Sequence, residues 1–199
     1  MSEAKVDSGR RTWIAITCGA GAIGGAAVAV PFVSSFAPSE RAKAAGAPVQ
    51  ADISGLRPGE KMTVEWRGKP VWIVRRTEEQ LATLAKTESL VADPLSKRNP
   101  SELTPEYARN IPRSIKPEIL VCVGICSHLG CSPTDKFTPG AQPSLPDDWQ
   151  GGFFCPCHGS TFDMAGRVFK NKPAPDNLEV PRHMYLSDTL LLIGEDSKG

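Results

Sequence analysis

Two short motifs of cysteine and histidine carry the chemistry that this sequence is equipped to perform. The first reads Cys-Ser-His-Leu-Gly-Cys over residues 126–131, and the second reads Cys-Pro-Cys-His-Gly-Ser over residues 155–160. Together they offer two thiolates and two imidazoles at close spacing, from Cys126, His128, Cys155 and His158. This donor set suits a [2Fe–2S] centre in which two histidines replace two cysteines on one iron.

The same donors have two other interpretations. A structural zinc site also takes two cysteines and two histidines, but zinc fingers usually pair them as Cys-x-x-Cys and His-x-x-x-His. Zinc would also leave Cys131 and Cys157 unexplained, whereas these two residues, one in each motif, are well placed to join the motifs by a disulfide. A framework of disulfides alone would not need a histidine beside a cysteine twice. The iron–sulfur interpretation is favoured, and the other two remain alternatives.

The two motifs resemble the cluster-binding boxes of the Rieske subunit of bacterial ubiquinol–cytochrome c reductase (complex III), and the resemblance extends over nearly the whole chain. It implies an all-β fold, a Rieske-type antiparallel β domain with a cluster-binding subdomain, preceded by one N-terminal transmembrane helix. It also implies one [2Fe–2S] cluster. The implied pairings are Cys126 and Cys155 on one iron, His128 and His158 on the other, and a disulfide between Cys131 and Cys157.

The resemblance assigns roles to residues around the cluster. Ser160 matches a serine that donates a hydrogen bond to a bridging sulfide. Phe162 stands where many members have a tyrosine whose hydroxyl binds a ligand sulfur, so the redox potential is in question here. His158 would be the hydrogen-bond partner of quinol and its proton acceptor, and Leu129 and Gly130 would dock against cytochrome b.

A proline-rich stretch completes the resemblance. Lys172-Pro173-Ala174-Pro175 resembles the family's proline loop, in which Pro173, Ala174 and Pro175 would cover the third side of the cluster. Families usually open that loop with Gly-Pro, and Lys172 occupies the glycine position here.

The implied function is electron transfer. The subunit would accept an electron and a proton from quinol and pass the electron to a c-type haem, acting as part of a quinol–cytochrome c oxidoreductase. Its partners would be cytochrome b and a c-type cytochrome in a dimeric membrane complex. The alternative is the Rieske subunit of an arsenite oxidase exported by the twin-arginine route. A soluble Rieske ferredoxin fits worst, because it has neither anchor nor disulfide.

Composition sets further limits. The chain has 199 residues and a net charge of +1, which gives no indication of a nucleic-acid partner. Glycine and proline number 18 each, as a loop-rich all-β domain requires. A disulfide between motif cysteines needs an oxidising compartment, so the domain is expected outside the cytoplasm.

The N-terminal segment predicts a membrane anchor. No charged residue occurs from Thr12 to Pro38, and about 20 apolar residues suffice to span a bilayer. Gly9-Arg10-Arg11-Thr12 just before it resembles a twin-arginine export signal. We therefore expect four segments: a cytoplasmic N-terminus with the signal (1–11), a transmembrane helix (12–36), a hinge linker (37–47) and a periplasmic Rieske domain (48–199, with its cluster-binding part at about 120–176), the whole anchored in the bacterial inner membrane.

Local patterns predict the elements of the soluble part. Alternating residues at 61–66 and an apolar run at 70–74 predict a hairpin. Thr77 and Gln80 form a capping box for a helix that ends near residue 86. A second, short helix is expected from an N-cap at Thr104 to about residue 110. Strands are expected at 120–123, 152–154, 167–169, 178–180, 184–186 and 189–193, with a surface loop at 132–151.

Overall fold

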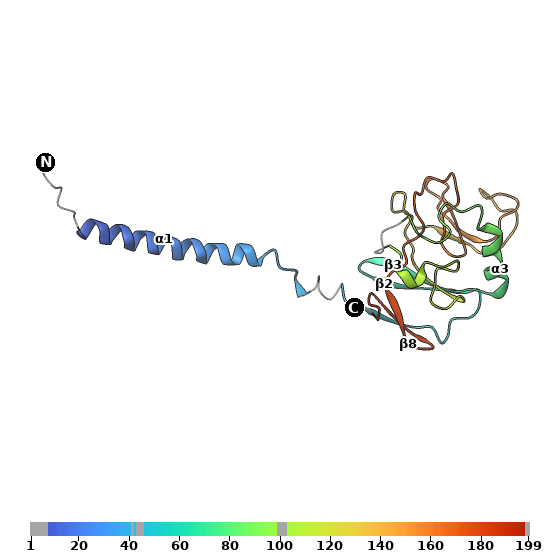
Figure 1. Ribbon diagram of the computed structural model, residues 1–199, viewed down its shortest axis with the longest axis horizontal. Coiled ribbons are helices and arrows are strands. Elements are labelled where there is room, and N and C mark those ends of the chain that lie inside the picture. Colours follow the sequence, from blue (N-terminus) through green and yellow to red (C-terminus); the bar gives the residue numbers. More distant parts are fainter. Residues whose placement is uncertain (1–7, 41, 43–45, 99–102, 198–199) are drawn as a thin grey trace. The chain divides into compact units, whose positions relative to one another are not determined.

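A computed structural model describes residues 8–40, 42, 46–98 and 103–197 (Figure 1). The chain divides into two compact units, residues 1–44 and 45–199, and each is described by itself. Residues 1–7 of the expected signal region, and 41 and 43–45 of the expected linker, lie outside the described part.

The first unit contains one long helix, α1 (Ser8–Ser34). Its 27 residues rise by about 40 Å, more than the roughly 30 Å hydrocarbon core of a bilayer. None of them is buried, and the helix is long and apolar enough to cross a membrane by length and composition. It begins at Ser8 rather than at the expected Thr12, so Arg10 and Arg11 lie in its first turn. The hydroxyl of Thr17 donates to the carbonyl of Trp13 at 2.9 Å, which satisfies a polar group inside the apolar stretch.

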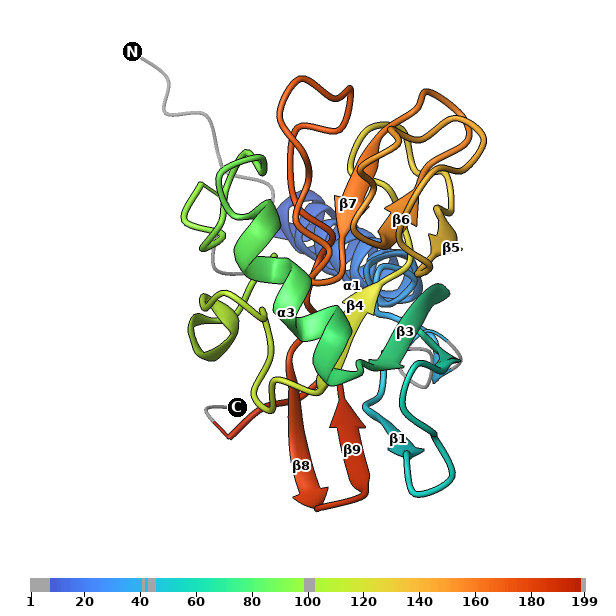
Figure 2. The same ribbon diagram turned by 90° about the vertical axis from the view of Figure 1, so that its right-hand side faces the viewer.

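In its described residues, the second unit is built on three antiparallel sheets of three strands each, which confirms the predicted all-β class. Their strand orders are β1-β9-β8, β2-β3-β4 and β5-β6-β7. The strands are β1 (Val49–Asp52), β2 (Lys61–Trp66), β3 (Lys69–Arg75), β4 (Ile119–Val123), β5 (Thr134–Lys136), β6 (Gly152–Phe154), β7 (Thr161–Asp163), β8 (His183–Ser187) and β9 (Leu190–Ile193). Figure 2 shows β3 and β4 between the other two sheets, which form opposite ends of the unit.

Strands β3 and β4 of the central sheet carry apolar residues on both faces because they separate two cores. On β3, Trp72 and Val74 face the core shared with the cysteine-containing loops, whereas Val71 and Ile73 face the core shared with β1 and β9. All five residues of β4 are buried, and they alternate between the same two cores. A strand covered on both faces reads as a continuous apolar run, which is how β4 stands in the sequence.

Two local predictions are confirmed. Thr77 accepts the amide of Gln80 at 3.2 Å and donates its own amide to the Gln80 side chain at 3.0 Å, so the capping box opens α3 (Glu78–Thr87). The β2–β3 hairpin turns at Arg67 and Gly68, whose φ angles of 54° and 70° are those of a type I′ turn.

The prediction of a short helix with its N-cap at Thr104 is wrong in the type of helix and in the cap. A single 3₁₀ turn, η1 (Glu106–Ala108), is found there, and its N-cap is Pro105 without a side-chain cap. The Thr104 hydroxyl is committed elsewhere, because it donates to the Leu103 carbonyl at 2.8 Å and accepts from Arg113 at 3.0 Å.

Some predicted strands are also wrong. Residues 178–180 form no ladder, because their backbone hydrogen bonds go to three separate segments, at Gly166, Val123 and Leu103. Residues 167–169 form only isolated bridges. Conversely, β5 lies inside the expected surface loop, and β7 had no sequence signal of its own, since both strands are only three residues long.

A set of buried charges occupies the core beside α3 and β7. The side chains of Arg76, Arg113, Arg167 and Asp163 are each at most 2% exposed. Arg167 and Asp163 form an ion pair of 2.7 Å, and both also contact the hydroxyl of Thr87. Asp163 further accepts the amides of residues 165 and 167, so it closes the turn that follows β7.

We expect Arg167→Met to lower the free energy of unfolding by about 3–5 kcal/mol, because it leaves the Asp163 carboxylate buried without its charge partner. Urea unfolding of the full chain measures this. Lys116→Met is the control, because it breaks an ion pair whose Asp188 is 98% exposed, and it should cost less than about 1 kcal/mol. Equal losses in the two variants would show that burial of the Arg167 pair is not what matters.

Candidate metal centre

The two motifs form loops with the same backbone hydrogen bonds. In loops 126–131 and 155–160 the amide of the first residue donates to the carbonyl of the sixth, at 2.8 and 2.7 Å. The amide of the fifth residue donates back to the carbonyl of the first, at 3.1 and 3.0 Å. The fifth residues are Gly130 and Gly159, with φ angles of +82° and +75°. An L side chain is strained there, which explains why both motifs carry glycine at that position.

The structure brings the four predicted ligands together. Cys126 and Cys155 are each 2% exposed and pack in the same core. The rings of His128 and His158 lie 4.7 Å apart between centroids and are perpendicular to each other. His128 is half-buried and His158 is exposed. The thiols therefore face the core, and the imidazoles lie toward the surface.

Burial is the largest influence on the pKa of the Cys126 thiol. Burial raises the pKa of the Cys126 thiol, and the neighbouring sulfur of Cys155 raises it further, although the amide of His128 and the hydroxyl of Ser160 oppose these effects. A metal bound by Cys126 must therefore displace a proton that burial holds on the sulfur.

A disulfide joins the outer ends of the loops. Cys131 and Cys157 are bonded at 2.11 Å with their Cα atoms 6.7 Å apart, so the predicted pairing is present. The sulfur of Cys155 lies within 4.8 Å of both disulfide sulfurs. This trio of sulfurs is not itself a metal site, because the two bonded cysteines offer no thiolate.

Residues 172–176, the expected cover of the cluster, lie against both loops and are held by one serine from each. The Ala174 amide donates to the Ser160 hydroxyl at 3.0 Å. The Ser127 hydroxyl donates to the Asp176 carbonyl at 2.6 Å, and the Asp176 amide returns a bond of 3.3 Å. Ala174 is buried, whereas Pro173 and Pro175 are exposed. Sequence reasoning missed Ser127, because its partner is 49 residues away and no local pattern marks it.

The remaining predicted residues lie around this centre. Phe162 is fully buried in the core that contains Cys126 and Cys155. Leu129, at the tip of the first loop, is 71% exposed, and Gly130 beside it is also exposed. The Leu129 side chain is therefore accessible to a partner.

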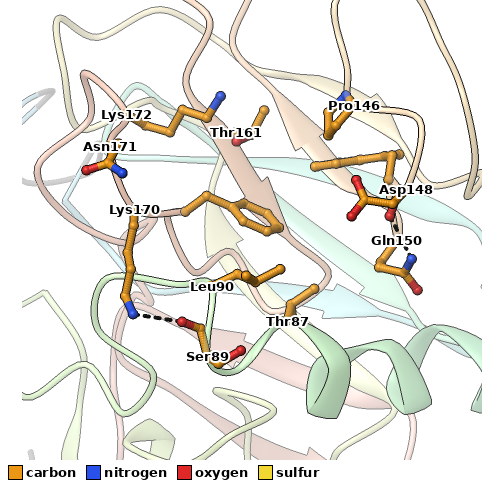
Figure 3. A pocket seen from close by; sticks show the side chains of 12 residues that line it. Thr87, Ser89, Leu90, Pro146, Asp148, Gln150, Thr161, Lys170, Asn171 and Lys172 are labelled. Carbon is orange, nitrogen blue, oxygen red and sulfur yellow. Dashed lines mark hydrogen bonds between the residues drawn. The ribbon is translucent and has the colours of Figure 1, made fainter.

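A separate cavity of about 350 Å³ is lined by residues 146–150, the end of α3 and residues 169–172. Figure 3 shows Lys170 and Lys172 on one side of it and Asp148 and Gln150 on the other. None of the four predicted ligands lines this cavity. The chemistry therefore lies at the loops, not at this cavity.

The comparisons agree with the geometry. A family described as the Rieske [2Fe-2S] domain matches residues 95–182, and one described as the ubiquinol–cytochrome c reductase Fe-S subunit TAT signal matches residues 1–39. Together these matches define the chain as a Rieske protein with an export signal.

Similar curated proteins narrow this class. The chain is 56% identical to the ubiquinol-cytochrome c reductase iron-sulfur subunit of Allochromatium vinosum, over 94% of this chain and 88% of the relative. It is 40% identical to the subunit of the same name from Bradyrhizobium diazoefficiens, over 93% and 94%. The corresponding subunit of Blastochloris viridis is 41% identical, over 89% and 88%. The chain belongs to the family of ubiquinol–cytochrome c reductase iron–sulfur subunits.

The residues present fit the [2Fe–2S] cofactor of this family. Two buried sulfurs and two surface-facing imidazoles match its donor set. The hydroxyl of Ser160 and the amide of His128 lie beside the Cys126 sulfur, where they can donate to a thiolate. The other two cysteines are already used in the disulfide, which excludes a four-thiolate ligand set at these loops.

We expect Ser127→Ala to release residues 172–176 from the first loop. It removes two hydrogen bonds, so the loss in unfolding free energy should be about 1–3 kcal/mol, and the cluster should bleach faster. Urea unfolding and visible absorbance measure the two effects. Ser132→Ala, at an exposed serine beside the same loop, is the control and should behave as wild type. Wild-type bleaching in Ser127→Ala would show that this serine does not protect the centre.

We expect Phe162→Tyr to raise the midpoint potential of the cluster by about 20–65 mV, because one new hydrogen bond to a ligand sulfur is worth about 0.5–1.5 kcal/mol. Such a bond favours the more electron-rich reduced state. Redox titration measures the shift, with Phe137→Tyr as the control for a hydroxyl added to another ring of this core, one that packs edge-on against Phe153. A midpoint at or below wild type would mean that the hydroxyl does not reach the sulfur.

Proposed function

We propose that this chain accepts an electron and a proton from ubiquinol and passes the electron to a c-type haem, within a complex that contains cytochrome b and a c-type cytochrome. The 56% identity over 94% of the chain carries this proposal, together with the pair of imidazoles at the surface of a buried thiol pair. The relatives described above are named as ubiquinol–cytochrome c reductase subunits, which gives no support to the arsenite oxidase alternative.

In this proposal Cys126 and Cys155 hold one iron, and His128 and His158 hold the other. When bound, the cluster supplies a one-electron acceptor. Burial of both cysteines supports their assignment, since it keeps water from the thiolate side.

His158 is proposed to handle the quinol proton. Its side chain is exposed, whereas that of His128 is half-buried, so His158 is the better placed to meet a substrate outside the domain. With one ring nitrogen of His158 on iron, the other nitrogen would first have to lose its proton, which the charge of a bound metal favours. That nitrogen can then accept a hydrogen bond from a quinol hydroxyl and take up the proton. Leu129 and Gly130 are proposed to seat the loop against cytochrome b, and so to exclude water around the imidazole.

The rest of the chain is proposed to carry the domain between its redox partners. Helix α1 would anchor the subunit in the inner membrane with its N-terminus in the cytoplasm, and residues 37–47 would act as the hinge. The domain would then work in the periplasm, within a dimeric complex. The exposed surface of α1 and the match of residues 1–39 to an export signal support this arrangement.

Purification of the subunit from native membranes tests the function as a whole. We expect cytochrome b and a c-type cytochrome to co-purify, and the complex to reduce cytochrome c with quinol as the donor. Co-purification with a molybdenum subunit, or with no cytochrome, would contradict the proposal.

We expect Leu129→Asp to lower kcat/KM for quinol by about tenfold or more, because burial of a leucine in a partner contributes about 1.5–3 kcal/mol. The electron paramagnetic resonance signal of the cluster should stay unchanged, since the side chain is 71% exposed. Leu186→Asp is the matched control, because this exposed leucine lies on β8, outside the ligand loops. Equal activity in the two variants would remove Leu129 from the docking surface.

A further inference from the structure

Arg76 and Arg113 are buried guanidinium groups that the proposed function does not use. Arg113 is 0% exposed and Arg76 is 2% exposed. Burial lowers the pKa of each to about 10, so both remain charged at neutral pH. Buried charges are costly unless they are paired, and this makes the partners of these two residues informative.

The partners are neutral. Arg113 uses all five of its N–H groups, and the acceptors are the hydroxyls of Ser96 and Thr104 and the carbonyls of Ala165, Gly166 and Leu178. Arg76 donates to the Ser114 hydroxyl and to the carbonyls of Pro112, Pro117 and Met164. Among the described residues, no carboxylate lies within 4.0 Å of either guanidinium.

Negative charges nearby do not cancel them. Asp163 is paired with Arg167 at 2.7 Å. Asp93 is 7% exposed, and its carboxylate accepts the amides of Lys97 and Arg98. The five buried side chains of Arg76, Arg113, Arg167, Asp163 and Asp93 thus sum to a charge of +1. A third buried carboxylate, Asp196, acts on Tyr107 and His183.

These charges are bonded to segments that pack in the same core as the ligand thiols. The accepting carbonyls belong to the turn after β7 and to Leu178, and Met164, Ala165 and Leu178 pack in the same core as Cys126 and Cys155. Strand β7 directly follows Ser160, the last residue of the second loop. The positive charges also act on Cys122 in this core, where they oppose the burial that raises its pKa to about 12.

The net charge of a bound cluster decides how the buried arginines affect it. Two ferric ions, two sulfides and two thiolates sum to zero, with neutral imidazoles adding nothing. One added electron makes the reduced centre a monoanion. In a medium of low dielectric constant, a fixed positive charge stabilises that anion over the neutral oxidised form.

We propose that Arg76 and Arg113 are positioning residues that raise the midpoint potential of the cluster, by holding carboxylate-free positive charge on segments that pack in the same core as Cys126 and Cys155. The proposal rests on the ligand assignment given above. The midpoint potential of the cluster sets the driving force with which the subunit would take an electron from quinol. Neither arginine gains or loses a proton in this role, so their charge acts on the electron, and the quinol proton is left to His158.

Removing either a positive or a negative buried charge tests this proposal, because the two kinds of variant should shift the midpoint potential in opposite directions. Arg113→Gln and Arg76→Gln should lower the midpoint, and Asp163→Asn should raise it, whereas Arg113→Lys should stay close to wild type. A change of tenfold in the reduction equilibrium constant corresponds to 59 mV, and we expect shifts of about this order. The full-length protein in its native complex is titrated, with the electron paramagnetic resonance signal as readout. Arg57→Gln, at an arginine that is 83% exposed, is the control for charge without burial.

The directions of the midpoint shifts distinguish an electrostatic effect on the cluster from a purely structural role of the arginines. A purely structural role predicts loss of stability in both kinds of variant, with midpoints that shift together or not at all, and either result overturns the proposal. If Arg113→Gln fails to assemble, Arg76→Gln and Asp163→Asn still give the two signs. A wild-type protein without the cluster signal would instead refute the ligand assignment, which is a distinguishable failure.

Discussion

The stack of Trp72 on Phe153 is the contact on which the metal centre depends. Their ring centroids lie 5.2 Å apart, with 18° between the planes. Trp72 stands on β3 opposite Cys122 of β4, the strand that leads to loop 126–131, whereas Phe153 stands on β6, which leads to loop 155–160. A rigid apolar contact therefore joins two separate sheets just before each one delivers a ligand loop. The position of the Trp72 ring also requires glycine at residue 124, since a Cβ there would lie 2.2 Å from the ring.

The buried arginines donate hydrogen bonds to backbone carbonyls of irregular segments, as a neighbouring strand does in a sheet. Backbone carbonyls at residues 112, 164–166 and 178 lie in connecting segments without a sheet ladder, yet buried carbonyls need donors. The Arg76 and Arg113 guanidiniums supply them. This explains how residues 178–180 can be ordered and buried without forming the strand that their sequence predicts. The same solution places positive charge in the core, so geometry and electrostatics come from one set of side chains.

The sequence predicts what is local and misses what is distant. The ligand pairs, the capping box and the 67–68 turn each lie within a few residues, so their chemistry can be read directly. Arg113 could not be assigned to the core, because charged residues are usually exposed and its acceptors are up to 65 residues away. His183 begins β8 but is 1% exposed, because its ring packs edge-on against Tyr107, 76 residues earlier. Ser127 was missed for the same reason.

The centre is asymmetric, and this asymmetry decides from where a substrate can approach. The thiol side faces the core, and residues 172–176 lie against both loops, where one serine from each loop holds them in place. The imidazole side is open, with His158 and Leu129 both exposed. Because a disulfide joins the two loops, the exposed leucine of one loop and the exposed imidazole of the other belong to a single cross-linked surface. The docking and the proton transfer that we propose would therefore use side chains that are already in place.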